Sequence, residues 1–215
     1  MKIGVLGSGM VGKVLAQGFA NHSYNVMIGS RDKKKLEEWK YESGFKSSVG
    51  TFEETAQYGE IVVLSVKGNK AIEAIDIAGK EKFKGKIVID TTNPIDDSAQ
   101  TENGVIKFFT NNEQSLMEQL QKKVPEAKFV KAFNSVGAAF MVNPDFGGIK
   151  PTMVICGNDD NARKEVSDIL VKFGWEVEDM GKANAAGTIE NLCILWCIPG
   201  FLRNDWSHAF KILRK

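Results

Sequence analysis

Short apolar runs alternate with longer amphipathic stretches along about the first 100 residues. The segments Lys2–Leu6, 61–66 and Ile87–Asp90 are nearly continuous runs of aliphatic residues, as expected of interior strands in a parallel sheet. Between the first two strands, apolar positions follow the helical period, at Val11, Val14, Leu15, Gly18 and Phe19. This alternation predicts βαβ units, and therefore an α/β protein with a doubly wound, mainly parallel sheet.

Weaker signals extend the predicted sheet. Further strands are expected at 24–28, 46–50, 128–132, 152–156 and 175–179, and further helices at 33–42, about 113–123 and 162–173. Thr51 and Glu54 have the spacing of a capping box that opens a short helix. The polar stretch 96–104 is expected to be a loop at the carboxyl edge of the sheet.

The C-terminal part is apolar on nearly every side of a predicted helix that starts near Gly187. Such a helix is buried, either against the domain or against a second copy of the chain. Pro199 and Gly200 are expected to end it, and the apolar positions between Trp206 and Leu213 predict a last amphipathic turn or two. We therefore expect one α/β domain over 1–180 and a helical segment over 181–215 that packs on this domain or on a dimer partner.

Composition narrows the function classes. The net charge of +1, from 28 basic and 27 acidic residues, gives no electrostatic footprint for nucleic acid or an anionic membrane. The longest apolar run, 192–198, is too short to span a bilayer, and the chain enters a strand without a leader, so a cytoplasmic protein is expected. Cys193 and Cys197 share a helix face and are expected to be packing residues. No cluster has metal-site spacing, and we expect no metal.

The clearest motif is the segment that follows the first strand, Gly7-Ser8-Gly9-Met10-Val11-Gly12. It has the G-x-G-x-x-G pattern between a strand and a helix. In this pattern the first glycine permits a tight turn, the second admits a pyrophosphate, and the third lets the helix pack closely. The helix N-terminus offers free N–H groups to the phosphates. The segment predicts a Rossmann-type dinucleotide site.

The end of the second strand indicates which dinucleotide is bound. An Asp or Glu that would bond the ribose hydroxyls of NAD is missing there, and Ser30 and Arg31 occupy the position. A hydroxyl and a guanidinium suit the 2′-phosphate of NADP, and Lys35 can add charge. Asp32 is the exception, because it could pair with Arg31 or reach a ribose. NADP(H) is therefore favoured over NAD(H).

With these residues in place, the chain resembles the NADP reductases that use the deazaflavin coenzyme F420. It also resembles the cytoplasmic oxidoreductase domain of the STEAP metalloreductases. The resemblance covers nearly the whole chain and rests on the glycine motif, on 29–32, on 130–136, and on 189–192 running into Leu195-Trp196. The STEAP proteins continue into a haem-binding membrane domain, whereas this sequence stops, so no membrane function is expected of it alone.

The resemblance implies direct hydride transfer between the nicotinamide and a stacked flavin-like ring, without a catalytic acid or base. The nicotinamide end should be lined by the loops after the later strands, which hold Ser65, Val66, Lys67, Asn93 and Asn134. Asn93 could instead form an Asx turn before Pro94, and Asn134 could cap a helix. The catalytic residues, and the choice among deazaflavin, FMN and FAD as acceptor, remain open.

Two other interpretations are considered. A reductase similar to pyrroline-5-carboxylate reductase needs a large helical domain after the sheet, and only about 35 residues follow Asp179. A non-catalytic NADP sensor that docks a partner through its apolar C-terminal helix is hard to separate from an enzyme. Because that helix has little domain surface to cover it, a homodimer is expected. The expected substrate is a small redox molecule. Neither histidine is expected to be catalytic, since His22 lies at the end of the first helix, far from the strand ends, and His208 is assigned a surface role in the last helix. Glu190 is attributed to helix-dipole complementarity.

Overall fold

The computed structural model describes residues 1–111 and 114–215. Within them, the strands are β1 (Lys2–Leu6), β2 (Asn25–Gly29), β3 (Ser48–Gly50), β4 (Ile61–Leu64), β5 (Ile87–Asp90), β6 (Lys128–Lys131), β7 (Thr152–Gly157) and β8 (Glu176–Asp179). The α-helices are α1 (Met10–Asn21), α2 (Lys33–Ser43), α3 (Phe52–Tyr58), α4 (Ala71–Ala78), α5 (Leu116–Lys123), α6 (Asp160–Lys172) and α7 (Ala186–Arg203). Each strand expected from the sequence is present, with its bounds within two residues of the prediction.

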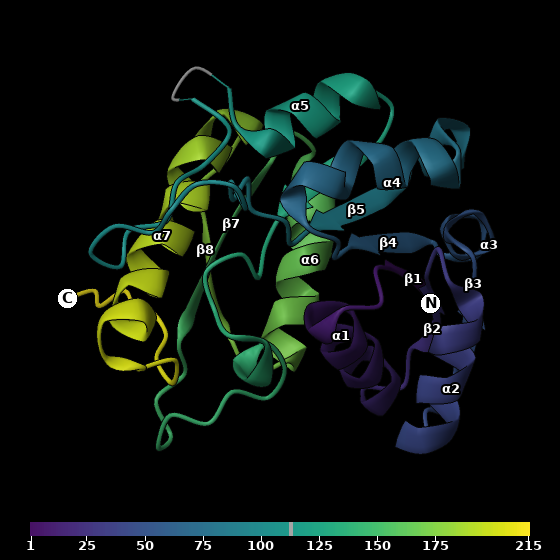
Figure 1. Ribbon diagram of the computed structural model, residues 1–215, viewed down its shortest axis with the longest axis horizontal. Helices are drawn as coiled ribbons and strands as arrows, with labels where there is room; N and C mark the ends of the chain where they lie inside the picture. The colour runs from purple at the N-terminus through teal and green to yellow at the C-terminus, as the bar shows by residue number, and fades with distance from the viewer. Residues whose placement is uncertain (112–113) are drawn as a thin grey trace.

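The eight strands of the described chain form one sheet in the order β3-β2-β1-β4-β5-β6-β7-β8. Neighbours are parallel except at β6 and β7, which run antiparallel, while β7 and β8 are again parallel. Figure 1 shows the sheet crossing the molecule from β3 beside α2 to β8 beside α7. The order 3-2-1-4-5-6 is that of a doubly wound dinucleotide-binding sheet, which confirms the expected Rossmann-type α/β fold.

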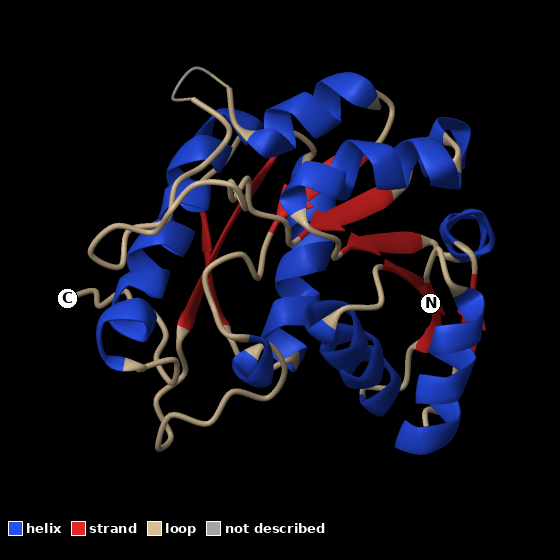
Figure 2. Cartoon of the chain, viewed as in Figure 1, coloured by secondary structure: helices blue, strands red, loops and turns tan. Residues whose placement is uncertain are grey.

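Helices cover both faces of the sheet, giving three layers (Figure 2). Helices α1, α2 and α6 pack on one face, and α3, α4, α5 and α7 pack on the other. Strand residues alternate between the two cores, as the period of a strand requires. In β1, for example, Ile3 and Val5 join the first core, and Leu6 joins the second. The interior strands are therefore apolar at successive positions because each face is buried.

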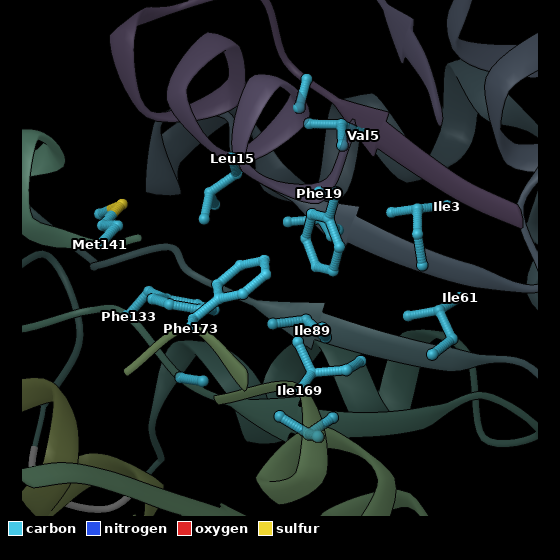
Figure 3. Close-up of a cluster of buried hydrophobic side chains, with 14 of the residues drawn as sticks. Ile3, Val5, Leu15, Phe19, Ile61, Ile89, Phe133, Met141, Ile169 and Phe173 are labelled. Atoms are coloured by element: carbon cyan, nitrogen blue, oxygen red, sulfur yellow. The ribbon is translucent and has the colours of Figure 1, made fainter. Parts of the chain in front are cut away.

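Aromatic and aliphatic side chains from distant segments meet in the first core (Figure 3). The rings of Phe19 in α1 and Phe173 after α6 are 4.9 Å apart in an edge-on arrangement, and neither is exposed. Phe133, which follows β6, packs in the same cluster. Contacts of this kind hold the C-terminal unit of β7, α6 and β8 to the N-terminal glycine-loop unit, so the two halves share one core.

Local capping follows the sequence closely at α3. The hydroxyl of Thr51 accepts from the backbone N–H of Glu54, and the carboxylate of Glu54 accepts from the N–H of Thr51. This confirms the predicted capping box. Ser115 and Glu118 form a second one at the start of α5. The predicted start of that helix near Glu113 lies outside the described residues.

The prediction for the C-terminus is wrong in two respects. Helix α7 continues through Pro199 and ends at Arg203, where Asn204 adopts a left-handed conformation. The residues beyond Asn204 form no helix in the described chain, although their apolar positions had suggested one. The reason is tertiary packing: the Trp206 ring lies over Gly200, and the backbone of Phe210 and Ile212 bonds to Thr152.

Helix α7 is only partly covered. Ile189, Cys193 and Trp196 are buried against the domain, whereas Leu195 and Leu202 are more than half exposed. By length and composition alone, the stretch Ala183–Arg203 could cross a membrane, with a mean hydropathy of 1.4. Core helices of soluble proteins meet the same criterion, so this feature by itself decides little.

Candidate functional site

The loop between β1 and α1 is shaped by three glycines. Gly7 has a φ of +125°, a value that residues with side chains rarely adopt. A Cβ on Gly12 would overlap the Gly7 carbonyl oxygen, so a larger residue would push α1 away from the loop. A Cβ on Gly9 would meet no atom within 4 Å, which leaves open space before the first turn of α1. The loop therefore presents backbone N–H groups with room for a phosphate.

The glycine loop forms one end of a cavity of about 540 Å³ at the carboxyl edge of the sheet. In a doubly wound sheet, ligands bind at this edge, at the point where the strand order reverses between β1 and β4. The structure brings eleven of the fourteen predicted site residues to the cavity wall: Gly7, Ser8, Gly9, Met10, Val11, Ser30, Arg31, Lys35, Ser65, Val66 and Lys67. Gly12 lies directly behind the loop, and Asn93 and Asn134 lie outside this wall.

A larger depression of about 930 Å³ lies between the end of α5 and the start of α6. Most of its lining residues are charged or polar, such as Lys122, Asp159 and Lys182. It lies at the start of β6, away from the carboxyl ends of the parallel strands, and no glycine loop borders it. We therefore regard the smaller cavity as the functional site.

At the end of β2, Ser30 is almost fully buried and organises its neighbours. Its hydroxyl lies 3.1 Å from the hydroxyl of Ser8 and accepts from the backbone N–H of Asp32 at 3.1 Å. Asp32 in turn caps α2, because its carboxylate accepts from the N–H of Lys35. The carboxylate that could have indicated NAD thus has a helix-capping role in this structure.

The charged side chains at the cavity mouth come from two walls. Arg31 is 60% exposed, and its Nη1 lies 3.0 Å from Oε1 of Glu73 on α4. Lys70, which also lines the cavity, contacts the other carboxylate oxygen of Glu73 at 2.9 Å. Lys35 extends into solvent, with a 3.9 Å contact to Asp32. Sequence reasoning missed Lys70 and Glu73, since a Lys and a Glu on a short helix normally indicate solvated surface.

The loop after β4 forms the third wall. The hydroxyl of Ser65 donates to the carbonyl of Leu6 at 2.9 Å, which fixes this loop against the end of β1. Lys67 contacts Asp97 at 2.9 Å, and Asn69 donates to the same carboxylate oxygen. Asp97 belongs to the predicted polar loop, which therefore does reach the cavity edge. Lys67 lines the cavity, as expected.

Asn93 and Asn134 form a pair beyond this wall. The Asn93 amide donates to the Asn134 carbonyl at 2.7 Å, and the Asn134 amide donates to Asn93 Oδ1 at 3.2 Å. Asn134 also donates to the carbonyl of Ile189 in α7 and is only 4% exposed. It does not cap a helix, because the 3-10 turn that follows begins after Gly137. Asn93 is half-buried and is the more accessible of the two.

A buried charged cluster lies next to this pair, and sequence reasoning missed it. Lys131, at the end of β6, lies 2.6 Å from Asp90 and 2.9 Å from Glu190, and it donates to the carbonyl of Thr92. All three charged residues are at most 2% exposed. The sequence did contain one indication of a buried ion pair, namely a Lys and an Asp within strands that are otherwise apolar. Charges in such places are normally paired.

Glu190 connects this cluster to α5. Its two carboxylate oxygens accept from the backbone N–H groups of Leu116 and Met117, each at 3.0 Å. Its carboxylate thus meets the positive N-terminal end of α5 rather than that of its own helix. The cluster joins β5, β6, α5 and α7 under the loop that carries Asn93. Burial acts to lower the pKa of Lys131, but the charges of Asp90 and Glu190 outweigh it, and the pKa is raised.

The cysteines of the chain are free and buried. Burial raises the pKa of Cys156 to about 12, so its thiol stays protonated at neutral pH. Cys193 and Cys197 belong to a small apolar cluster with Ile106 and Trp196, in agreement with the predicted packing role. Within residues 1–111 and 114–215, no group of three or more His, Cys, Asp or Glu side chains is arranged to hold a metal ion.

The strand order, the glycine loop and the cation-lined cavity define a Rossmann-type dinucleotide-binding protein. The profile of the family described as "NADP oxidoreductase coenzyme F420-dependent" matches residues 2–94. A crystal structure from Arthrobacter sp. FB24, provisionally assigned as an F420-dependent NADP reductase, has 33% identity and a TM-score of 0.93, covering 100% of both chains. The chain belongs to this F420-dependent NADP oxidoreductase family, and it is an NADP-dependent oxidoreductase.

Further relatives fall into two groups. The F420-dependent NADP reductase of Methanocaldococcus jannaschii is 29% identical over 201 residues, which cover 88% of each protein. Metalloreductase STEAP3 of Rattus norvegicus is 28% identical over 209 residues, which are 94% of this chain but 39% of that protein. The chain thus spans about two fifths of the length of STEAP3. An imine reductase of Streptomyces aurantiacus, at 14% identity and a TM-score of 0.69, shares the fold alone.

Proposed function

We propose that the protein transfers hydride between NADP(H) and a flavin-like acceptor, with the deazaflavin coenzyme F420 as the first candidate. The observation that carries this proposal is the cavity wall, where Ser30, Arg31 and Lys35 stand beyond the glycine loop. A phosphate on the adenosine ribose requires cations and hydroxyls at this position, whereas a free ribose would be served by a carboxylate at the end of β2.

The residues of the chain would hold the dinucleotide in two parts. Backbone N–H groups at the start of α1 bind the pyrophosphate, with Gly9 leaving the space that close approach requires. Arg31 and Lys35 bind the 2′-phosphate, and the planar guanidinium can also stack on the adenine. The loops that carry Lys67 and Asn93 orient the nicotinamide end.

NADPH, when bound, would supply the hydride from C4 of its nicotinamide ring to the acceptor ring, which also takes up one proton from solvent, and NADP⁺ would be released. The protein then needs no general acid or base, and its contribution is to align the two rings and exclude water. The Lys131 cluster suits this task because the buried ammonium group of Lys131 holds the carbonyl of Thr92, the residue just before Asn93. We assign no catalytic residue.

The acceptor is proposed from relationship rather than from a built site. The relative from Methanocaldococcus jannaschii is named for coenzyme F420, and the match covers 88% of each protein. FMN and FAD have similar ring systems and are the alternatives to be compared. Action in the cytoplasm is part of this proposal, since the relatives named as F420-dependent reductases match without the extra length of STEAP3.

The first experiment is a titration of the purified protein with NADPH and with NADH, followed by nicotinamide fluorescence. The same titration is made with Arg31→Ala and with Arg203→Ala, a matched control whose side chain is equally exposed at the end of α7. We expect NADPH to bind more tightly, and Arg31→Ala to weaken NADPH by about ten-fold or more while leaving NADH unchanged. Arg203→Ala should match the wild type.

Turnover is then measured with coenzyme F420, FMN and FAD as acceptors, by loss of NADPH absorbance. Oxidation that is fastest with F420 would support the full proposal, and oxidation only with FMN or FAD would replace the acceptor. Equal affinity for both nucleotides, unchanged in Arg31→Ala, would refute the NADP site. NADPH binding without turnover on any acceptor would favour a sensor.

The homodimer remains a separate proposal. It is supported by the outward face of α7, where Leu195, Phe201 and Leu202 are each more than half exposed. Burying such side chains against a second copy would remove apolar area from water. Light scattering of the wild type and of a Leu195→Glu/Leu202→Glu variant tests this. A monomeric wild type would refute it.

A further inference from the structure

The basic side chains around the cavity are already paired with carboxylates. Four of them line it in the described chain: Arg31, Lys35, Lys67 and Lys70. Their partners are Glu73 for both Arg31 and Lys70, Asp32 for Lys35, and Asp97 for Lys67. A phosphate that enters the cavity must therefore compete with a carboxylate for each of these cations. The position of that carboxylate affects whether NADPH or NADH binds more tightly.

Glu73 differs from the other two carboxylates in its position. It lies on α4, on the wall opposite the end of β2, so its 3.0 Å contact with Arg31 spans the cavity mouth. It also holds Lys70 at 2.9 Å, and the hydrogen bond and charge of Lys70, together with Arg31, keep the pKa of Glu73 below its usual value. Asp32 also lines the cavity, but its carboxylate caps the start of α2 on the same wall as Arg31, whereas Asp97 lies on a loop outside the cavity wall. Glu73 is thus an ionised carboxylate within the dinucleotide cavity itself.

The two dinucleotides meet this carboxylate differently. The 2′-phosphate of NADPH needs Arg31, one of whose nitrogens is engaged by Glu73, and its own negative charge is repelled by the Glu73 carboxylate. The 2′-hydroxyl of NADH carries no charge and has a proton that a carboxylate can accept. The same side chain therefore opposes NADPH and leaves NADH unaffected or better bound.

We propose that Glu73 is a specificity-determining residue: it competes with the 2′-phosphate for Arg31 and thereby reduces the preference of the site for NADPH over NADH. This inference rests on the proposed NADP site. The glycine loop and the end of β2 bind the dinucleotide, whereas the α4 wall, through Glu73, limits how strongly the site prefers NADPH over NADH.

The test compares wild type, Glu73→Gln and Glu73→Lys by calorimetric titration with NADPH, NADH, 2′,5′-ADP and 5′-ADP. The two ADP ligands isolate the adenosine end, since they lack the nicotinamide. For Glu73→Gln we expect NADPH and 2′,5′-ADP to bind about three-fold more tightly, a size typical of an exposed ion pair. NADH and 5′-ADP should stay the same or weaken. Glu73→Lys should increase the gain further, and added salt should reduce it.

Asp76→Asn is the matched control, because Asp76 lies on the same helix and pairs with Lys80 and Lys123 outside the cavity. It should change none of the four affinities. If the wild type selects NADPH through Arg31 but Glu73→Gln leaves the NADPH to NADH ratio unchanged or lowers it, this inference is wrong while the NADP site stands. If Arg31→Ala, with Glu73 intact, binds NADPH as tightly as the wild type does, the proposed function itself fails.

Discussion

The ammonium group of Lys131 lies 2.6 Å from the carboxylate of Asp90, and neither side chain is exposed to solvent. Glu190, also buried, is the second partner of the same ammonium group. A buried ion pair is not in itself evidence of high stability, because both charges have been taken out of water. Removing one partner, however, leaves an uncompensated charge, and this makes the cluster a sensitive point of the fold.

Replacing Lys131 with Met should strongly destabilise the protein. Met keeps much of the side-chain volume but leaves two buried carboxylates without their cation, so we expect a loss of about 3–5 kcal/mol in the free energy of unfolding. Urea denaturation measures this loss. Lys84→Met is the control, since Lys84 pairs with Glu126 at the surface, and should change stability little. Similar unfolding midpoints for the two variants would contradict the prediction.

Stability should also depend on Lys131 at alkaline pH. Burial lowers its pKa, but Asp90 and Glu190 raise it more, so the folded pKa lies above that of the unfolded chain, about 10.4. Below that value the stabilisation is complete. As pH rises through the folded pKa it is lost, because the unfolded chain releases its proton first. Urea unfolding between about pH 8 and about pH 11 should therefore show the gap between wild type and Lys131→Met narrowing. A constant gap would refute this.

Two glycine variants should separate folding from binding. A Cβ on Gly9 meets nothing within 4 Å, so Gly9→Ala should keep wild-type stability yet weaken NADPH and NADH alike, by roughly ten-fold or more, by blocking the phosphate. A Cβ on Gly12 would overlap the Gly7 carbonyl, so Gly12→Ala should lose about 1–3 kcal/mol of stability. Thermal unfolding and nucleotide titration together check both. Normal binding by Gly9→Ala would contradict the predicted phosphate position.

The role of Asn93 can be isolated with truncated ligands. Asn93→Ala should weaken NADPH by about 2- to 10-fold, the range of one lost hydrogen bond, while 2′,5′-ADP binds as before because it lacks the nicotinamide. Asn21→Ala, on the surface of α1, serves as control. Equal weakening of both ligands would show instead that the loop has lost its shape.

Much of the fold follows from residue patterns because the interior strands are apolar at successive positions. The structure places the glycine motif and the Ser30-Arg31 pair in one cavity, since both follow strands whose carboxyl ends share an edge. The wall supplied by α4 was missed. Its charged residues, Lys70 and Glu73, follow no motif, and only the strand order, in which β4 returns to pair with β1, brings them opposite Arg31.

The C-terminus illustrates the opposite limit. Pro199 normally ends a helix, and the periodic apolar residues after it normally form another. In the structure, Gly200 has no side chain, and this allows Trp206 to pack directly over it, so the helix continues and the tail folds back to bond with Thr152 without forming a helix. This packing depends on the combination of Gly200 and Trp206, and neither residue alone indicates it in the sequence.

The anchoring of α7 has a consequence for how the chain opens in the native state. At its start, Ile189 accepts a bond from Asn134 and Glu190 is fixed by Lys131, so backbone amides there should exchange with deuterium only through global unfolding. Near its end, Pro199 has no N–H to offer the Leu195 carbonyl, and the last turn is covered mainly by the Trp206 ring. We therefore expect one continuous helix to contain a first half that exchanges slowly and a last turn that opens more readily.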